Sequence, residues 1–405
     1  MLASLRDGGW ITIERLRAYC LMLVIAYALG FASLAVASRD GVDGQGRALG
    51  SDFAEVYAAG TLVDRGEPAR PYDSAAHFER QREIFGPKTA IYTWNYPPFF
   101  LAVAGLLAGL PYLAALLAWM LATLPVYLAA ARGFLNVREA WLGALAFPAV
   151  FSNLGHGQTG FLAAGLFAGG LALLDRRPVF AGVLLALLAF KPQFGLLIPF
   201  ALAAGGRWKT MAAATATLAV MVGATLLAWG PGVWSPFLGG LPEARLHGLE
   251  YSNTGFYKMQ SLFAAVRMLG GPVPLAYALH ATLLAAVVAC VVGVWRGEVD
   301  FRLKAAALLV GALLATPYCF DYDMVIEGPA LAALISYGLA RGFVPWEKTI
   351  LAVAFAAPLL ARPVAMVTAL PIGLASLLMV FALVVHHAAT NGAPSRAASR
   401  RFAGA

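Results

Sequence analysis

Apolar residues run through almost the whole chain in long stretches that are separated by short polar segments. Stretches of this kind are typical of helices that cross a membrane. The expected spans are 16–38, one within 97–131, 139–152, 158–174, 178–190, 194–206, 209–230, 274–295, 303–317, 323–341, 349–360 and 363–387. The block at 97–131 is long for one helix and short for three, so we expect one span and a half-inserted segment there. The pattern predicts an all-α integral membrane bundle of about 12 transmembrane helices.

A polar island at 50–73 separates the first apolar span from the others. Ser51 is expected to cap a helix that holds Asp52 and Glu55 in its first turn and ends before Gly66. The apolar stripe of this helix consists of Phe53, Val56, Tyr57, Gly60 and Val63. A helix with one apolar face is predicted to lie along the membrane surface rather than to cross it.

We expect a single domain, 1–405, whose polar segments form loops and a tail on the two sides of the membrane. Residues 39–96 form the first extracytoplasmic loop, which carries the polar helix. The second extracytoplasmic loop, 231–273, is rich in Gly, Pro and Trp and is expected to hold one amphipathic helix, Phe256–Leu269. Residues 388–405 form a basic tail, which is expected on the cytoplasmic side.

Composition and charge place the chain in a membrane and orient it. The residues are 60% hydrophobic and 12% charged, whereas soluble domains are about 25% charged. The segments expected in the cytoplasm are the N-terminus, 132–139, 175–177, 207–209, 296–304, 341–348 and the tail. They hold 17 basic and 7 acidic residues, against 12 and 14 in the rest of the chain. Because basic residues are retained inside, we expect cytoplasmic termini and a multi-pass protein of the bacterial inner membrane.

Other sequence features narrow the classes of function. Cys20, Cys290 and Cys319 lie far apart and indicate neither a disulfide framework nor a metal site. The first span is followed by charged residues and not by a small-residue cleavage site, so we interpret it as a retained anchor. The sequence has neither a Walker-type phosphate loop nor a nucleotide-binding domain, so we do not expect the sugar donor to be a nucleotide sugar used in the cytoplasm. The net charge of +8 follows from the topology and indicates no nucleic-acid partner.

Five polar groups are expected at the same outer face of the membrane. They are Asp52, Tyr96-Pro97-Pro98, Gly155-His156-Gly157-Gln158, Lys191-Pro192-Gln193 and Asp321-Tyr322-Asp323. Polar residues at membrane boundaries are usually interfacial loops, but the convergence of five groups on one face suggests a functional site.

Several of these segments resemble glycosyltransferase family 87, a family of multi-pass GT-C enzymes that includes a mycobacterial phosphatidylinositol-mannoside mannosyltransferase. The resemblance runs from about residue 50 to about residue 330 and rests on Ser51-Asp52-Phe53, Tyr57-Ala58-Ala59-Gly60, Pro71-Tyr72-Asp73, Asn95-Tyr96-Pro97-Pro98-Phe99, Gly157-Gln158, Phe190-Lys191-Pro192-Gln193 and Tyr322-Asp323. It implies a GT-C fold, a polyprenyl-phosphate-sugar donor and an active site on the extracytoplasmic face. It also implies an acidic base in the first outer loop, which corresponds to Asp52, and no metal or other cofactor.

Asp52 also has a simpler interpretation. An acid in the first turn of a helix often only stabilises the helix dipole, and a helix N-terminus lowers the pKa of a carboxylate and weakens it as a base. A catalytic role fits if the acceptor proton leaves late, so that the carboxylate mainly orients the hydroxyl. The rival acids are Glu55, which can share the face of Asp52, and Asp64 and Asp73, which resemble turn residues.

The leaving phosphate requires positive charge or hydrogen-bond donors and no general acid. Lys191, beside a proline between two apolar spans, is the best candidate. The alternative is a lysine that reaches for lipid headgroups. Arg245, Lys258 and Arg267 in the second outer loop are further candidates.

The predicted donor- and acceptor-binding residues are Lys191, Gln193, Gln158, Tyr57, Tyr96, His156, Tyr322 and Asp323. Amides such as Gln158 and Gln193 can bind sugar hydroxyls, but at span ends they also satisfy backbone groups. Asp321 and Asp323 could coordinate a divalent cation or serve an acceptor-binding or structural role, and the resemblance favours a site without metal. Glu327, a buried acid within a span, is a further functional candidate.

The sequence therefore predicts a membrane glycosyltransferase that uses Asp52 as base. It would transfer a hexose such as mannose from a polyprenyl-phosphate sugar to a lipid or glycan hydroxyl, with inversion, among membrane lipids. A transporter or flippase of lipid-linked sugars is the alternative, although no internal repeat is visible and the polar residues gather at one face rather than at the midplane. A non-enzymatic scaffold would not need the converging polar groups.

Overall fold

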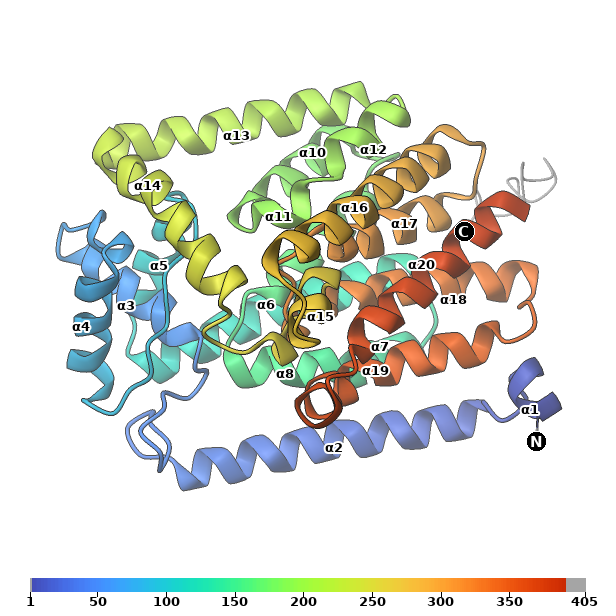
Figure 1. The fold of residues 1–405 in the computed structure, drawn as a ribbon, viewed down its shortest axis with the longest axis horizontal. Helices are drawn as coiled ribbons and strands as arrows, with labels where there is room; N and C mark the ends of the chain where they lie inside the picture. Colours follow the sequence, from blue (N-terminus) through green and yellow to red (C-terminus); the bar gives the residue numbers. More distant parts are fainter. Residues whose placement is uncertain (1, 391–405) are drawn as a thin grey trace.

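A computed structural model of the chain describes residues 2–390, and in this range helices are joined by loops without any β-strand (Figure 1). Seven helical segments are long and apolar enough to cross a membrane. They are α2 (Ile13–Ala37), α6 (Tyr112–Phe134), α13 (Trp208–Trp229), α16 (Val273–Arg296), η6 with α18 (Asp321–Arg341), α19 (Glu347–Thr368) and α20 (Ile372–Thr390). These observations confirm an all-α polytopic membrane protein.

Shorter helices fill the space between the long ones. They are α5 (Phe100–Ala108), α7 (Glu139–Ala146), α8 (Pro148–His156), α9 (Gly160–Ala172), α10 (Pro178–Leu187), α11 (Pro192–Gly195), α12 (Ile198–Ala204) and α17 (Phe301–Ala315). The expected number of about 12 spans is therefore not confirmed, because prolines such as Pro148 and Pro192 begin new helices inside apolar runs. The block at 97–131 contains one short and one long helix, as its length suggested.

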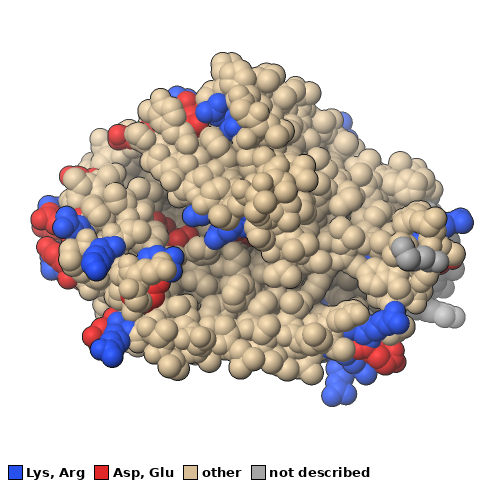
Figure 2. Space-filling view, turned by 60° about the horizontal axis from the view of Figure 1, so that its bottom comes forward, with Lys and Arg blue, Asp and Glu red and all other residues tan. Residues whose placement is uncertain are grey.

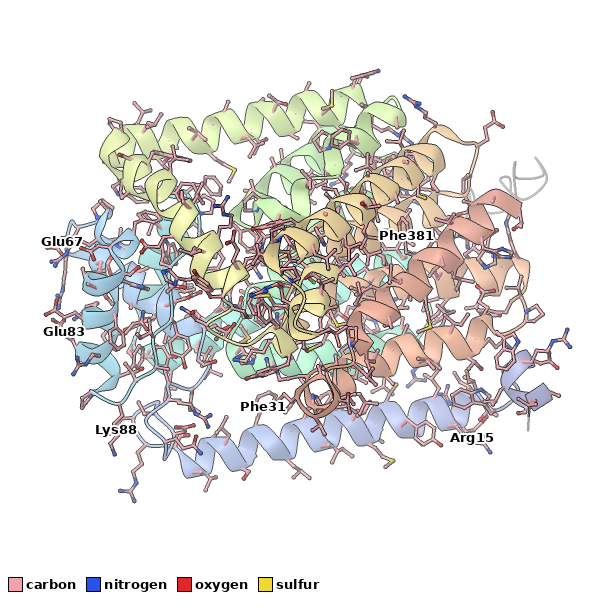
Figure 3. The ribbon with its side chains drawn as sticks, viewed as in Figure 1. Arg15, Phe31, Glu67, Glu83, Lys88 and Phe381 are labelled. Atoms are coloured by element: carbon pink, nitrogen blue, oxygen red, sulfur yellow. The ribbon has the colours of Figure 1, made fainter. Side chains whose placement is uncertain are left out.

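The long helices run roughly parallel, and the N-terminus and the C-terminal end of α20 lie at the same end of the bundle (Figure 1). Helices α3 (Phe53–Asp64) and α4 (Ser74–Phe85) of the first loop lie at the opposite end. Figure 3 shows Glu67, Glu83 and Lys88 at that end, far from Arg15. On the face shown in Figure 2, most charged side chains lie toward the two ends of the molecule, and the surface between them is largely uncharged apart from a few charged side chains around a hollow. This arrangement fits a membrane crossed by the long helices.

The core of the bundle combines small, aliphatic and aromatic side chains. Twelve of the 15 residues of α17 are buried, whereas α2 and α13 lie along opposite edges of the bundle with few buried residues (Figure 1). An apolar helix with an exposed surface is stable in contact with lipid tails. The expected basic tail lies outside the described residues from 391 onward.

Helix α3 differs from its expected form in two respects. The N-cap position is Asp52 and not Ser51, and no side chain caps the helix. Residues on both sides of α3 are buried, so it does not rest on the membrane surface by one apolar face, as expected, but packs between α4 and α5. Gly60 makes this possible, since a Cβ there would lie 2.0 Å from the Ala104 carbonyl oxygen. The helix ends as predicted, with Gly66 at φ +79°.

Two other expected boundaries are wrong. The expected break at 361–362 lies inside α19, which continues past Pro358 and Pro363 and ends before Pro371. Prolines are tolerated there because neighbouring helices support the backbone of a membrane helix. Arg362 is therefore part of a helix and not of a loop.

The second loop contains more helical structure than its pattern indicates. The expected helix at 256–269 is divided into η5 (Phe256–Lys258) and α15 (Leu262–Met268). The backbone N–H of Gln260 donates to the Cys319 carbonyl between them, at 2.7 Å. Helix α14 (Trp234–Ala244) and the π-helical turn η4 (Arg245–Glu250) precede them and were not predicted.

Candidate active site

The start of α3 meets the end of α8 at the charged end of the bundle. The backbone N–H of Asp52 donates to the His156 carbonyl at 3.0 Å. Gly157 ends α8 in the left-handed conformation, at φ +63°. A Cβ at Gly157 would lie 2.7 Å from the Cβ of Phe53, so only glycine allows the two helix ends to approach so closely. This junction brings His156 and Gln158 beside Asp52.

Both carboxylate oxygens of Asp52 accept hydrogen bonds. Gln158 Nε2 donates to Oδ2 at 2.9 Å, and Ser51 Oγ donates to Oδ1 at 3.1 Å. His156 Nδ1 lies 3.5 Å from the same Oδ1. Burial raises the pKa of Asp52, but its interaction with His156 and the hydrogen bonds from Gln158 and Ser51 outweigh this and hold that pKa below its ordinary value. Asp52 is therefore an ionised carboxylate of fixed orientation.

The amide of Gln158 is itself held in one orientation. Its Oε1 accepts from the backbone N–H of Thr159 at 2.9 Å and from the hydroxyl of Tyr96 at 3.4 Å. Since the carbonyl oxygen faces these donors, the NH₂ group must face Asp52. Tyr96 and Gln158 thus support Asp52, and their predicted contact with a sugar stays a prediction.

Arg362 from α19 joins the same network, and its role was not predicted. Its Nη2 lies 3.2 Å from His156 Nε2, and its Nε donates to Asp321 Oδ2 at 2.5 Å. Because guanidinium groups only donate, His156 Nε2 must accept and Nδ1 must carry the proton. Nδ1 then donates to Ser51 Oγ at 2.8 Å, which leaves the serine hydroxyl proton for Asp52. A directed chain of donors therefore runs from Arg362 to the Asp52 carboxylate.

Lys191 and Asp323 form a buried ion pair next to this network. Lys191 Nζ donates to Asp323 Oδ1 at 2.7 Å, and the side chains are 7% and 2% exposed. The ring of Tyr322 lies 5.0 Å from the ammonium and 5.9 Å from the His156 ring. The expected contact of Lys191 with a donor phosphate stays a prediction, and it would have to compete with Asp323.

Glu55 lies one turn along α3 from Asp52 and is buried. Burial raises the pKa of Glu55 well above its ordinary value, the negative charge of Asp52 raises it further, and Lys191 opposes both. Two neighbouring carboxyl groups thus have pKa values that are displaced in opposite directions. Such a pair can supply an ionised and a protonated group to the same site.

Other predicted residues lie away from Asp52 or have structural contacts. The Tyr57 hydroxyl donates to the Leu110 carbonyl at 2.9 Å, and Asp73 caps α4. Glu327 accepts from Ser376 at 3.2 Å inside the bundle. Gln193 makes no side-chain hydrogen bond with a residue in the range 2–390. In that range no three His, Cys, Asp or Glu side chains are grouped as metal ligands would be.

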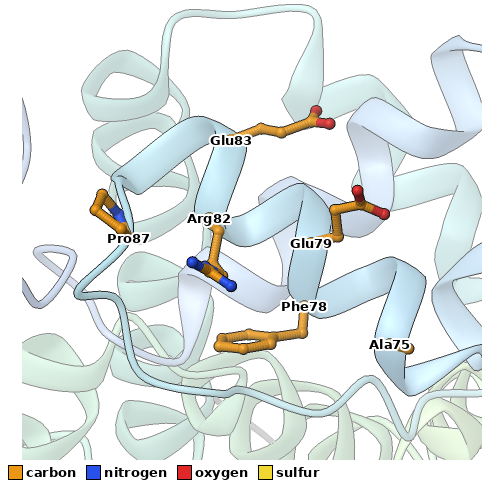
Figure 4. A pocket seen from close by; sticks show the side chains of 6 residues that line it. All are labelled: Ala75, Phe78, Glu79, Arg82, Glu83 and Pro87. Carbon is orange, nitrogen blue, oxygen red and sulfur yellow. The ribbon is translucent and has the colours of Figure 1, made fainter.

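Two surface depressions are lined by helices of the two outer loops. The first is on α4 and is lined by Ala75, Phe78, Glu79, Arg82, Glu83 and Pro87 (Figure 4). None of the residues linked to Asp52 by hydrogen bonds (Ser51, His156, Gln158 and Arg362) lines this first depression. The second is lined by Phe256, Tyr257, Arg267, Met268 and residues 365–369. Along the chain, its lining residues begin next to Lys258 in η5 and one turn beyond Arg362 in α19.

Replacing Gly157 with Ala should separate α8 from α3. The left-handed backbone costs an alanine roughly 1–2 kcal/mol, and the new Cβ would also collide with Phe53. We expect a lower midpoint of thermal unfolding in detergent together with a loss of activity. Gly143→Ala, in α7 with open space around its Cβ, is the matched control and should be neutral or slightly stabilising. Equal stability of the two variants would contradict the packing described.

The sequence was compared with known proteins and families. The sequence model of glycosyltransferase family 87 matches residues 94–317, which is more than half of the 405 residues. The matched range includes Tyr96, His156, Gln158, Lys191 and Gln193. Asp52 precedes it, and Asp321, Asp323 and Arg362 follow it. No curated protein and no solved structure matches the chain.

Proposed function

This chain belongs to glycosyltransferase family 87, and from that premise we propose that it transfers a hexose such as mannose from a polyprenyl-phosphate sugar to the hydroxyl of a lipid or glycan. The observation that carries the proposal is the ionised carboxylate of Asp52, which accepts hydrogen bonds from Gln158 and Ser51 and lies 3.5 Å from His156 Nδ1 at one end of a membrane bundle. A carboxylate so oriented can accept a proton without rearrangement. The site lies at the end of the bundle that we assign to the extracytoplasmic face of a bacterial inner membrane.

The reaction is a single displacement at the anomeric carbon. The acceptor oxygen bonds to this carbon on one side while the bond to the phosphate oxygen breaks on the other, which inverts the configuration. The proton of the acceptor hydroxyl passes to Asp52, and the electron pair of the broken bond leaves with the polyprenyl phosphate. Because phosphate is a stable anion, it needs electrostatic stabilisation and no protonation.

Product formation by the purified protein tests this function. The protein in detergent is given a radiolabelled polyprenyl-phosphate hexose or the corresponding nucleotide sugar, with a lipid extract as acceptor. Transfer from the lipid-linked donor alone is expected. Transfer only from the nucleotide sugar would contradict the proposed donor class. If neither donor supports transfer and the protein, once reconstituted in vesicles, carries the labelled lipid across the membrane, a transporter is favoured.

The orientation is tested separately by labelling with a membrane-impermeant thiol reagent on intact cells. A cysteine at Ala75, which is exposed on α4, should be labelled, whereas one at Glu298, in the loop before α17, should not. The reason is the excess of basic residues in the loops at the Glu298 end. The parent protein, with its three natural cysteines, gives the background. Labelling of the Glu298 site alone would move the active site to the cytoplasm.

A further inference from the structure

Two cations at the border of the Asp52 site have unused hydrogen-bond donors. Arg362 uses two of the five N–H donors of its guanidinium for Asp321 and His156, and its side chain is 28% exposed. Lys258 is half-buried, and its ammonium makes no hydrogen bond or ion pair with any residue that the structure describes. A half-buried ammonium without a partner has lost hydration that an anionic ligand could replace.

The two cations act on each other and on the acids of the site. The segment η5, which carries Lys258, lies against α19, which carries Arg362. Burial lowers the pKa of Lys258 and the charge of Arg362 lowers it further, whereas Asp52 and Asp321 oppose this shift. Lys258 and Arg362 therefore repel one another, and an anion bound between them would relieve that repulsion.

The shape of the surface beside them indicates what kind of anion fits. The second depression begins at η5 and follows the end of α19. Its lining mixes polar and apolar surface in about equal parts, and the apolar side chains of Met366 and Val367 are exposed on its α19 side. A ligand whose charged group lies between Lys258 and Arg362 could lay an apolar chain along this depression toward the lipid.

We propose that Arg362 and Lys258 bind the phosphate group of an amphiphilic phosphate ester whose apolar chain lies in this depression. The inference rests on the proposed function and assigns the leaving phosphate of that reaction to these two residues. Arg362 lies outside the residues that the family model matches, so its assignment to the phosphate is based on the geometry of the structure alone. Both cations would stabilise the charge that grows on the phosphate as the bond to the sugar breaks.

Lys258→Met is the main test, because it removes a charge without breaking any contact of the described structure. Arg362→Gln is the second variant. Affinity for polyprenyl phosphate is measured with the full-length protein in detergent by thermal shift, and the donor KM by sugar transfer. Both variants should bind polyprenyl phosphate at least about tenfold more weakly and show a donor KM raised to the same degree, as expected for a lost charge-assisted contact. Arg65→Gln, exposed at the end of α3 and paired with Glu83, should be unchanged.

Several outcomes would overturn the proposal. One is wild-type affinity for polyprenyl phosphate in both variants, above all if Lys191→Met has lost it. Another is equal affinity of the wild type for inorganic phosphate and polyprenyl phosphate, because the apolar depression would then contribute nothing. Weaker binding in both variants, in a protein that transfers no sugar from the lipid-linked donor, would support the phosphate site and contradict the proposed function.

Discussion

Replacing Asp52 with Asn should lower kcat at least ~100-fold, the contribution associated with general-base catalysis. The amide has the size of the carboxylate and can still accept from Gln158, while its NH₂ group can donate to Ser51. Folding and donor KM should therefore change little. The measurement is kcat and donor KM of the purified variant, with the midpoint of thermal unfolding as the control for folding.

The pH profile of kcat distinguishes Asp52 from Glu55 as the base. The pKa of Asp52 is held below its ordinary value of 3.8, so a reaction that needs this carboxylate ionised should keep its rate from neutral pH down to that range. The pKa of Glu55 is raised well above its ordinary 4.5, so a reaction that depends on ionised Glu55 should already lose rate at a clearly higher pH. Glu55→Gln is the matched variant and should leave the acid limb of the profile unchanged.

Two results would contradict the role of Asp52. If Asp52→Asn retains near-wild-type turnover while Glu55→Gln is inactive, the base is Glu55. If both variants are fully active, this helix does not take part in catalysis. An acid limb well above pH 4.5 that is present in the wild type and persists in Asp52→Asn would support the first of these alternatives.

The sequence predicted the part of the site that is carried by short polar motifs next to apolar runs. Asp52, His156 and Gln158 were expected on one face, and the structure places Gln158 Nε2 at 2.9 Å and His156 Nδ1 at 3.5 Å from the Asp52 carboxylate. The ends of membrane-spanning helices lie at one of the two membrane surfaces, so polar residues at the ends of spans are expected at one surface or the other. Polarity and position along the chain are sufficient for that inference.

Arg362 was missed because a proline and an arginine in an apolar run resemble a loop between two spans. The helix continues instead, and the charged side chain is supported by Asp321 and His156, which are distant in sequence. A charged residue inside an apolar run is a functional candidate by default, and this signal was available. The partners of Lys191 and the burial of α3 depend on contacts between distant segments, which a pattern of hydrophobic residues does not encode.

Removing Lys191 alone should destabilise the protein by about 3–5 kcal/mol, because Asp323 would be left buried without its partner charge. The variant to test is Lys191→Met, because methionine keeps most of the side-chain volume of lysine. Unfolding of the purified protein in detergent measures the effect. Lys209→Met, at an exposed position of α13, is the matched control and should be nearly neutral.

The double variant Lys191→Met with Asp323→Asn separates a structural role from a catalytic one. With both charges removed, no buried ion lacks a partner, so most of the lost stability should return. If the ion pair is structural, the donor KM of the double variant should then also approach the wild-type value. A donor KM that stays high after stability has returned would show that Lys191 contacts the donor phosphate, and the phosphate would then lie deeper in the bundle than Arg362 and Lys258.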